Sequence, residues 1–352
     1  MFSISRMNVN LQVLWTFLSF IVIVDGCFPY DTKFSKVADN IQVPTVARNQ
    51  WWCPANRFYG WLGYVRDLKG WSCGDAVYSL ARLRQDFKKM ADDGAKLVRI
   101  YGPICEQEMV WDNIIQAAAE NNLGVLGIVW HGYSDTELNK WQERKTSLMN
   151  VLRKPLSKYV VHSVSFGSEP LFSWSISGTF VAELEKIKGE LNALDIPLTV
   201  SEMKYGYDVA PAAARNAVIK NIDFISAHIM PYYGTCDLPG NVWNFIKNDI
   251  EAFKQMIPNK QIMITQNPWG SNRYGRNRGS NCGSDVWKGV SLEGANEYWK
   301  LWISNCQYFK QQQIGWFAHT FSADSEYNFG IYGPRTDVMA HPHHIDFKPI
   351  FC

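Results

Sequence analysis

The sequence lacks several patterns that mark common classes of protein. Its net charge is only +2, from 35 Lys plus Arg against 33 Asp plus Glu, so it has no basic excess of the kind that a dedicated nucleic-acid-binding protein shows. No Cys-x-x-Cys pair is present, which argues against a structural zinc site, and the His-rich segment at 341–344 has no carboxylate or cysteine partner at a recognised spacing. The chain contains no Asn-x-Ser/Thr sequence, so N-glycosylation is not predicted. We therefore expect no metal ion, no cofactor and no nucleic-acid partner.

Long apolar runs are also lacking, except for one at the N-terminus. Arg6 precedes the apolar residues 11–24, and Asp25, Gly26 and Cys27 follow them. A basic start, an apolar stretch of about 14 residues and a small residue are typical of a secretory signal peptide, and the stretch is short for a bilayer span. We expect a signal peptide over 1–26, a mature domain over 27–352 that is secreted and has no membrane contact after cleavage, and disulfide bonds among the eight cysteines. An uncleaved signal anchor is the alternative.

Short apolar runs alternate with helical patterns from about residue 58 onward. Eight runs have the character of buried strands, at 58–65, 96–102, 124–132, 161–169, 197–202, 223–231, 261–266 and 314–321. In the segment after the first run, Leu80, Leu83, Phe87 and Met90 form one apolar stripe, and Gly94 lies where a helix commonly ends. The repeated strand–helix unit predicts a single (β/α)8 TIM barrel, with 27–57 as an extension packed on it. Two domains and a doubly wound open sheet are the alternatives, but no Gly-x-Gly-x-x-Gly follows the first strand.

Active sites of such barrels lie at the carboxyl ends of the strands. Polar and aromatic residues at these ends are therefore the candidates, namely Tyr101, His131, Glu169, Glu202, His228, Tyr232, Gln266, Trp269 and His319. Glu169 is the strongest of them, because it follows a β-run and a carboxyl held among aromatic groups can have a raised pKa and protonate a leaving oxygen. The alternative is an ordinary solvated loop glutamate.

Five segments, in order and on the predicted strands, carry a resemblance to a known family. They are LVRIYGPIC at 97–105, VSFGSEP at 164–170, DFISAHIMPYYG at 223–234, ITQNPWGS at 264–271 and WFAHTFSADSEYNFGIYG at 316–333. Over roughly residues 55–335 the chain resembles glycoside hydrolase family 17, the β-1,3-glucanases, in its fungal form. The resemblance implies a retaining mechanism with two carboxylates, an acid/base after the fourth strand and a nucleophile after the seventh. It places Glu169 in the first role.

The residue that matches the nucleophile is Gln266, and an amide is a poor nucleophile. His319 stands where fungal members usually carry Glu, and His228 replaces the usual Asn. Three explanations remain open: a natural loss that leaves a glucan-binding barrel, an engineered change, or a rearranged site in which another acid takes over. Glu202 is the main candidate for that acid, with a purely hydrogen-bonding role as its alternative, and Asp324 and Glu326 are weaker candidates.

Aromatic residues near the strand ends can stack on sugar rings. Those residues are Tyr101, Trp130, Tyr232, Tyr233, Trp269 and Trp316. The 15 tryptophans of the chain allow two interpretations, either ligand stacking or a tryptophan-rich core. We count Tyr101, Trp130, Tyr232 and Trp269, with Glu202, His228 and His319, as substrate-binding residues. The expected function is a monomeric, secreted glucan endo-1,3-β-glucosidase-like hydrolase acting on cell-wall β-1,3-glucan, and the alternative is an inactive glucan-binding protein.

Overall fold

The computed structural model describes residues 32–54, 57–68, 70, 72–131, 140–173, 178–272, 289–324, 326, 328–334 and 344–349. The predicted signal peptide and residues 341–343 of the His-rich segment lie outside these residues. The strands are β1 (Lys36–Val37), β2 (Asn40–Ile41), β3 (Gly60–Asp67), β4 (Leu97–Tyr101), β5 (Gly124–Val129), β6 (Val161–Ser168), β7 (Leu198–Met203), β8 (Ile225–His228), β9 (Ile262–Gln266) and β10 (Gly315–Ala318).

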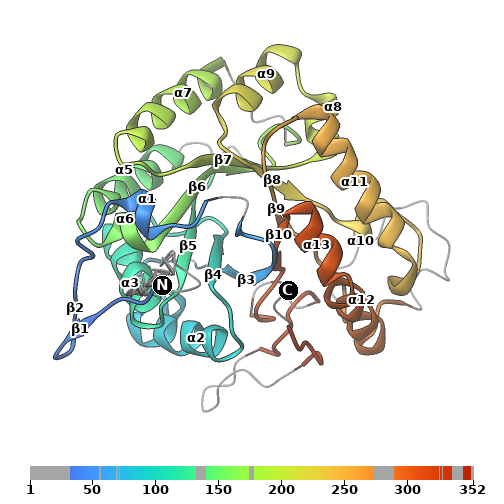
Figure 1. Cartoon of the computed structure of the whole chain (residues 1–352), viewed down its shortest axis with the longest axis horizontal. Coiled ribbons are helices and arrows are strands. Elements are labelled where there is room, and N and C mark those ends of the chain that lie inside the picture. The colour runs from blue at the N-terminus through green and yellow to red at the C-terminus, as the bar shows by residue number, and fades with distance from the viewer. Residues whose placement is uncertain are drawn as a thin grey trace, which may run out of the picture.

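Helices alternate with these strands along the chain. They are α1 (Arg48–Trp51), α2 (Leu80–Asp92), α3 (Glu108–Glu120), α5 (Trp141–Leu152), α6 (Ser157–Val160), α7 (Gly178–Asn192), α8 (Lys204–Val209), α9 (Ala212–Asn221), α10 (Pro231–Gly234), α11 (Trp243–Met256), α12 (Leu292–Ser304) and α13 (Cys306–Gln312), with 3₁₀ turns η2 (Ala76–Tyr78) and η3 (Pro239–Asn241). Figure 1 shows the helices arranged around the strands.

Eight parallel strands form a closed barrel in the order β10-β3-β4-β5-β6-β7-β8-β9. Each corresponds to one of the eight predicted strands. Closure is made by β10, which pairs with β3 on one side and with β9 on the other. The prediction of a (β/α)8 barrel is therefore confirmed, and the open sheet is excluded because the barrel has no free edge.

The first covering helix shows how local sequence sets these elements. The side chain of Ser79 caps α2 by accepting a hydrogen bond from the Arg82 backbone N–H, and Leu83, Phe87 and Met90 are buried as predicted. Gly94 follows the helix with a φ of +92°, a conformation that costs little without a Cβ. Farther along, the sequence has one continuous amphipathic period from about residue 295 to residue 313, but Asn305 divides this segment into α12 and α13.

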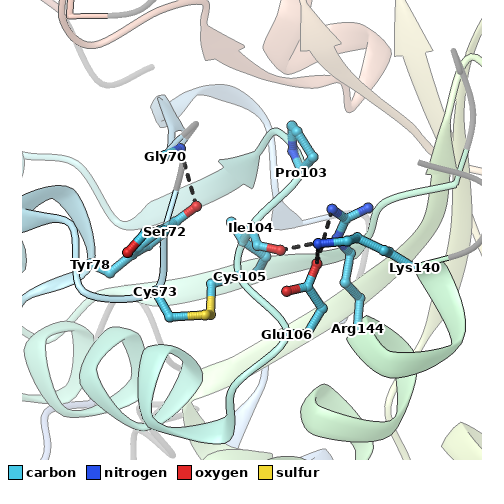
Figure 2. A pocket seen from close by; sticks show the side chains of 10 residues that line it. All are labelled: Gly70, Ser72, Cys73, Tyr78, Pro103, Ile104, Cys105, Glu106, Lys140 and Arg144. Carbon is cyan, nitrogen blue, oxygen red and sulfur yellow. Dashed lines mark hydrogen bonds and ion pairs between the residues drawn. A yellow bond between two sulfur atoms is a disulfide. The ribbon is translucent and has the colours of Figure 1, made fainter. Parts of the chain in front are cut away.

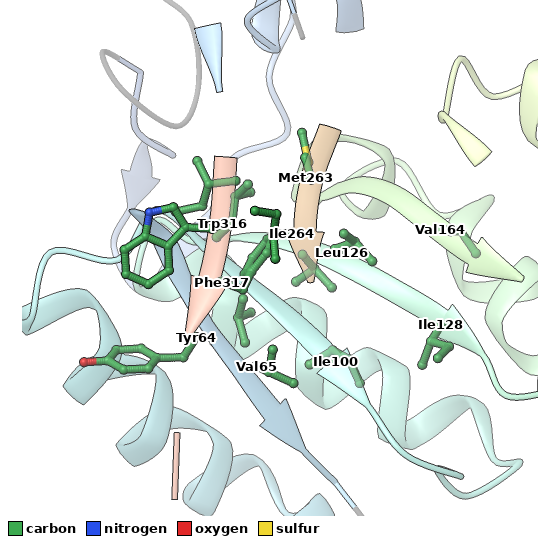
Figure 3. Packing of buried hydrophobic residues seen from close by; sticks show 14 of the residues in the cluster. Tyr64, Val65, Ile100, Leu126, Ile128, Val164, Met263, Ile264, Trp316 and Phe317 are labelled. Atoms are coloured by element: carbon green, nitrogen blue, oxygen red, sulfur yellow. The ribbon is translucent and has the colours of Figure 1, made fainter. Parts of the chain in front are cut away.

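The core is rich in aromatic side chains. Figure 3 shows buried residues from several strands, including Tyr64 of β3, Ile100 of β4 and Trp316 of β10. The Trp316 ring stacks on Trp299 of α12 at 6.2 Å. Among the described tryptophans all are buried except the partly buried Trp243, which favours a tryptophan-rich core over a broad ligand-stacking surface.

The expected N-terminal extension closes the amino end of β6. The guanidinium of Arg48 in α1 donates hydrogen bonds to the backbone oxygens of Val161 and His162, and Trp51 Nε1 donates to Tyr159 O at 2.9 Å. Burial lowers the pKa of Arg48 to about 10. Because side chains of α1 bind backbone oxygens at the start of β6, the N-terminal segment is part of the amino end of the barrel.

A disulfide joins Cys73, after β3, to Cys105, after β4. It confirms the expectation of disulfide bonding, for which the sequence predicted no pairing, and ties together two loops at the carboxyl end of the barrel. In the part of the chain that the structure describes, no helix is both long and apolar enough to cross a membrane.

Candidate active site

The carboxyl ends of the barrel strands bring Glu169 and Gln266 into one cluster. Glu169 directly follows β6 with a φ of +55°, and its backbone N–H donates to Ser201 O of β7 at 2.7 Å. Gln266 is the last residue of β9 and lies beside His228 of β8 in the strand ladder. His228 in turn contacts the Glu169 side chain, so it joins the two positions that the sequence comparison singled out.

Arg99, His228 and Glu169 form a hydrogen-bonded chain across the barrel mouth. The Arg99 Nη2 atom lies 3.4 Å from His228 Nε2, and His228 Nδ1 lies 2.7 Å from Glu169 Oε1. A guanidinium can only donate, so His228 Nε2 is the acceptor and Nδ1 carries the proton. His228 is therefore a neutral donor to Glu169 Oε1, and Oε2 is left to carry the acidic proton.

Burial sets the electrostatics of this chain. It raises the pKa of Glu169 to about 7, a rise that Arg99 and His319 oppose and that the Glu326 carboxylate increases. Burial together with Arg99 and His319 lowers the pKa of His228 well below its usual value, in agreement with the neutral tautomer. Near neutral pH a substantial share of Glu169 is thus a protonated acid, which is the form needed to protonate a leaving oxygen.

Gln266 lies on the opposite side of His228 from this acid. Its side chain is buried and shares a hydrogen bond with that of Tyr101, the last residue of β4. The Tyr101 ring packs edge-on against both Trp130, at 5.2 Å, and His319, at 5.3 Å. The matching position therefore holds a fixed neutral amide, which can donate or accept hydrogen bonds but carries no charge to attack a sugar carbon.

Glu202 is fully buried in β7, and its carboxylate accepts hydrogen bonds from backbone N–H groups. Oε2 accepts from the N–H groups of Leu171 and Phe172 at 2.7 and 3.1 Å, and Oε1 accepts from Met203 N at 2.8 Å. Burial and the neighbouring Glu169 raise its pKa to about 8. This arrangement favours the hydrogen-bonding alternative, because Glu202 holds the turn that presents Glu169 rather than facing a substrate or water.

His319 and Glu326 form a second polar pair at the mouth, after β10. His319 Nε2 lies 2.5 Å from Glu326 Oε2, and the Glu326 side chain is 28% exposed while that of His319 is 2% exposed. Glu326 also interacts electrostatically with Glu169, Tyr101 and Arg99. The sequence shows Glu326 only as one of two carboxylates in a loop, and nothing in its spacing predicts that it folds back onto His319.

With this geometry in place, comparison with known proteins decides the family. Residues 66–329 match the BtgE/BtgC glycoside hydrolase domain, which is well over half of the chain. The chain belongs to this family. The expected resemblance is thereby confirmed at the level of a glycoside hydrolase domain. Among curated proteins no sequence gives a significant match.

Solved structures show what the BtgE/BtgC domain resembles in fold. A glycoside hydrolase family 17 β-1,3-glucanosyltransferase from Rhizomucor miehei aligns with a TM-score of 0.60 and 17% identity, covering 82% of this chain and 98% of the other. An active-site mutant of the R. miehei enzyme in complex with laminaritriose gives 0.58 and 17%, covering 83% and 100%. A GH2 β-galacturonidase from Eisenbergiella tayi gives 0.52 and 12%, covering 78% and 48%. At these identities the likeness establishes the barrel fold alone.

Among the aromatic candidates of the BtgE/BtgC domain, Tyr233 is 44% exposed, whereas others are buried. Tyr232 and Trp269 are completely buried and pack against each other at 5.7 Å, so neither presents a ring face at the mouth. Two rings that the sequence did not single out follow the ends of β6 and β7: Phe172, three residues after Glu169 and partly buried, contacts Tyr205 of α8 at 5.9 Å, and Tyr205 is 57% exposed. Tyr232 and Trp269 therefore pack beneath the site and do not present a surface for a sugar ring.

A cavity of about 340 Å³ lies on the same end of the barrel, beside the loops that follow β3 and β4. Figure 2 shows the Cys73–Cys105 disulfide on one wall and Glu106 facing Lys140 and Arg144 on the other. Glu106 Oε1 lies 3.4 Å from the Lys140 ammonium and 3.3 Å from Arg144 Nη2. The two sulfurs and Glu106 lie within 4.8 Å of one another, but sulfurs joined in a disulfide are not thiolate ligands for a metal ion.

Proposed function

We propose that this BtgE/BtgC domain is a secreted glycoside hydrolase that acts on β-1,3-glucan, with Glu169 as the acid that protonates the leaving glycosidic oxygen. The observation that carries the proposal is a buried carboxyl at the end of β6 whose pKa is raised to about 7 and which accepts a hydrogen bond from the neutral His228. Such a group remains partly protonated at neutral pH yet loses its proton readily, as general acid catalysis requires.

The glucan is proposed from three kinds of support. The R. miehei relatives in fold are named β-1,3-glucanosyltransferases, and one is bound to laminaritriose. The contacting rings of Phe172 and Tyr205 offer an apolar surface beside the acid, which suits the CH-rich face of a glucosyl ring. A chain with a net charge of +2 also suits a neutral polysaccharide. The N-terminal apolar stretch and the disulfide support export to the cell surface or wall, where such a substrate lies.

A second candidate function is glucan binding without cleavage. Gln266 favours it, because the amide removes the covalent step of the retaining mechanism that the matching position would perform. In this case the mouth would bind the same oligosaccharide, and Glu169 would act as a hydrogen-bonding group.

Incubation of the purified protein with laminaripentaose separates the two functions. The hydrolase predicts new reducing ends or transfer products, and Glu169→Gln abolishes them while oligosaccharide binding remains measurable by calorimetry. The control variant Glu183→Gln removes the charge of a carboxylate on α7 that is 25% exposed and pairs with Lys145 at 3.5 Å, and it should keep full activity. Binding without any product supports the second function. If the protein neither binds laminaripentaose nor forms product from it, both functions are refuted.

A further inference from the structure

We propose that Glu326, held in place by His319, is the general base of an inverting hydrolysis in which Glu169 is the general acid. The inference rests on the proposed function, because it assigns the second catalytic carboxylate of the same site. It explains how a barrel with Gln266 at the nucleophile position can still cleave a glycosidic bond.

The topology places the strands that precede the two glutamates on opposite sides of the barrel. Glu169 follows β6 and Glu326 lies in the loop after β10, and in the closed strand order three strands separate β6 from β10 in either direction. Retaining enzymes place their carboxyl groups about 5–5.5 Å apart, whereas inverting enzymes need about 6.5–9.5 Å to fit a water molecule behind the sugar. Residues that follow opposite strands of an eight-stranded barrel fit the wider arrangement better than the narrower one.

The other carboxylates near the mouth are already engaged. Glu202 is fully buried and accepts three backbone hydrogen bonds through its two oxygens. Asp324, in the same loop as Glu326, is bound by Arg82 Nη2 at 2.6 Å and by the Ser322 hydroxyl at 3.0 Å. Glu326 differs from both, because its side chain is 28% exposed and faces a histidine rather than an arginine. It can therefore meet water while it remains oriented.

His319 acts as a positioning residue for this base. Its ring packs against Tyr101 at 5.3 Å and Phe329 at 6.2 Å, and its backbone N–H donates to Asn267 Oδ1 at 3.2 Å. A ring fixed on these sides holds the Nε2–H donor toward Glu326 Oε2. Tyr101, which packs on His319, also shares a hydrogen bond with the Gln266 side chain. The base, the amide and the acid therefore belong to one connected cluster.

The proposed step balances in protons and bonds. The ionised Glu326 removes a proton from a water molecule as the water oxygen forms a bond to the anomeric carbon. The bond from that carbon to the glycosidic oxygen breaks at the same time, and the leaving oxygen receives the proton of Glu169. Glu326 ends protonated and Glu169 ionised, and exchange with solvent restores both. The attacking water enters on the face opposite the leaving group, so a β-linked substrate gives an α-anomer product.

Proton NMR of the first products from wild-type protein and laminaripentaose tests the stereochemistry directly. We expect the α-anomer before mutarotation mixes the two forms. Initial formation of the β-anomer overturns the inference while leaving the hydrolase in place. Wild-type binding without cleavage also overturns it but keeps the glucan-binding function, and absence of binding overturns this inference and the proposed function together.

Variants test the residue itself. Glu326→Gln should lower kcat by about 10²–10⁴, the usual contribution of a positioned base, with little change in the Kd for laminaripentaose. Glu183→Gln, matched in exposure at 25%, should retain wild-type kcat. Azide should restore turnover to Glu326→Ala and give an α-glucosyl azide, a product that a merely structural role does not predict. Full activity in Glu326→Gln, or no azide product from folded Glu326→Ala, refutes the assignment.

Discussion

Replacing Glu169 by Gln should stabilise the folded protein at neutral and alkaline pH while removing its activity. Burial raises the pKa of Glu169 from 4.5 to about 7. Below about pH 4.5 the carboxyl is protonated in both the folded and the unfolded chain, so it adds no pH-dependent difference. As pH rises toward 7 the unfolded chain ionises first, and the wild-type free energy of unfolding falls until the folded group has also ionised.

The size of the effect follows from this rise in pKa. Each pKa unit corresponds to about 1.4 kcal/mol, so the wild type should lose roughly 3 kcal/mol relative to its stability at pH 4. Gln does not titrate, and its side-chain oxygen can still accept the hydrogen bond from His228 Nδ1. The variant should therefore match the wild type near pH 4 and exceed it by roughly 3 kcal/mol above pH 7. Relief of the repulsion between Glu169 and Glu202 adds to the gain in the same direction.

Urea unfolding at pH 4, 5.5, 7 and 8.5 measures this difference. The difference between the wild type and Glu169→Gln, taken at each pH, cancels the titration of groups that the two proteins share. Glu185→Gln is the control, because its exposed carboxylate makes only a long surface ion pair with Lys220 at 3.8 Å and should give a difference that is small and independent of pH. A Glu169→Gln variant that is no more stable than the wild type at pH 8.5 would refute the reasoning about burial.

Four further variants test the other parts of the site. Gln266→Glu restores a carboxylate at the nucleophile position and should add β-anomer product to the NMR spectrum of a laminaripentaose digest; unchanged stereochemistry would mean that the seventh-strand alignment is wrong. Glu202→Gln leaves at least one buried N–H without its acceptor and should lower the free energy of unfolding in urea by about 1–3 kcal/mol, together with kcat. Gly206→Ala should lower stability and kcat in a similar way without changing the charge, because the added Cβ would lie 2.3 Å from Glu202 Oε1. If neither Glu202→Gln nor Gly206→Ala has an effect, the structural role of Glu202 is excluded. Tyr205→Ala should weaken laminaripentaose binding roughly tenfold in calorimetry, as expected for the loss of about 1.4 kcal/mol of stacking. The control Tyr59→Ala, before β3, should leave binding unchanged. Equal losses of affinity in the two variants would argue against a sugar-binding role for the Tyr205 ring.

The fold could be predicted from sequence because its signals are local and repeated. Most barrel strands are short apolar runs followed by a helix, and the Leu83, Phe87, Met90 stripe of α2 can be recognised without knowledge of the rest of the chain. Asn305, which divides the last helical segment into two, was not predicted, because the apolar period continues across it. The number of tryptophans did not tell whether their rings lie in the core or at the surface, since both environments favour them.

The site could be predicted only in part. Strand ends mark the mouth of any such barrel, so Glu169, Gln266 and His228 were identified as candidates from their positions alone. Their hydrogen bonds could not be predicted, because those depend on side-chain directions across the barrel rather than on spacing along the chain. For the same reason Glu202 was considered a replacement acid, although backbone N–H groups hold it in the structure.

The barrel, the place of its mouth, and the exchange of a carboxylate for Gln266 can all be read from residue type and order. Which side chains face one another at the mouth depends on the tertiary structure. It brought Arg99 to His228, buried Trp269, and folded the loop after β10 so that Glu326 meets His319 opposite Glu169. These contacts join residues far apart in the chain, and the burial that shifts the pKa of Glu169 exists only once the barrel has closed around it.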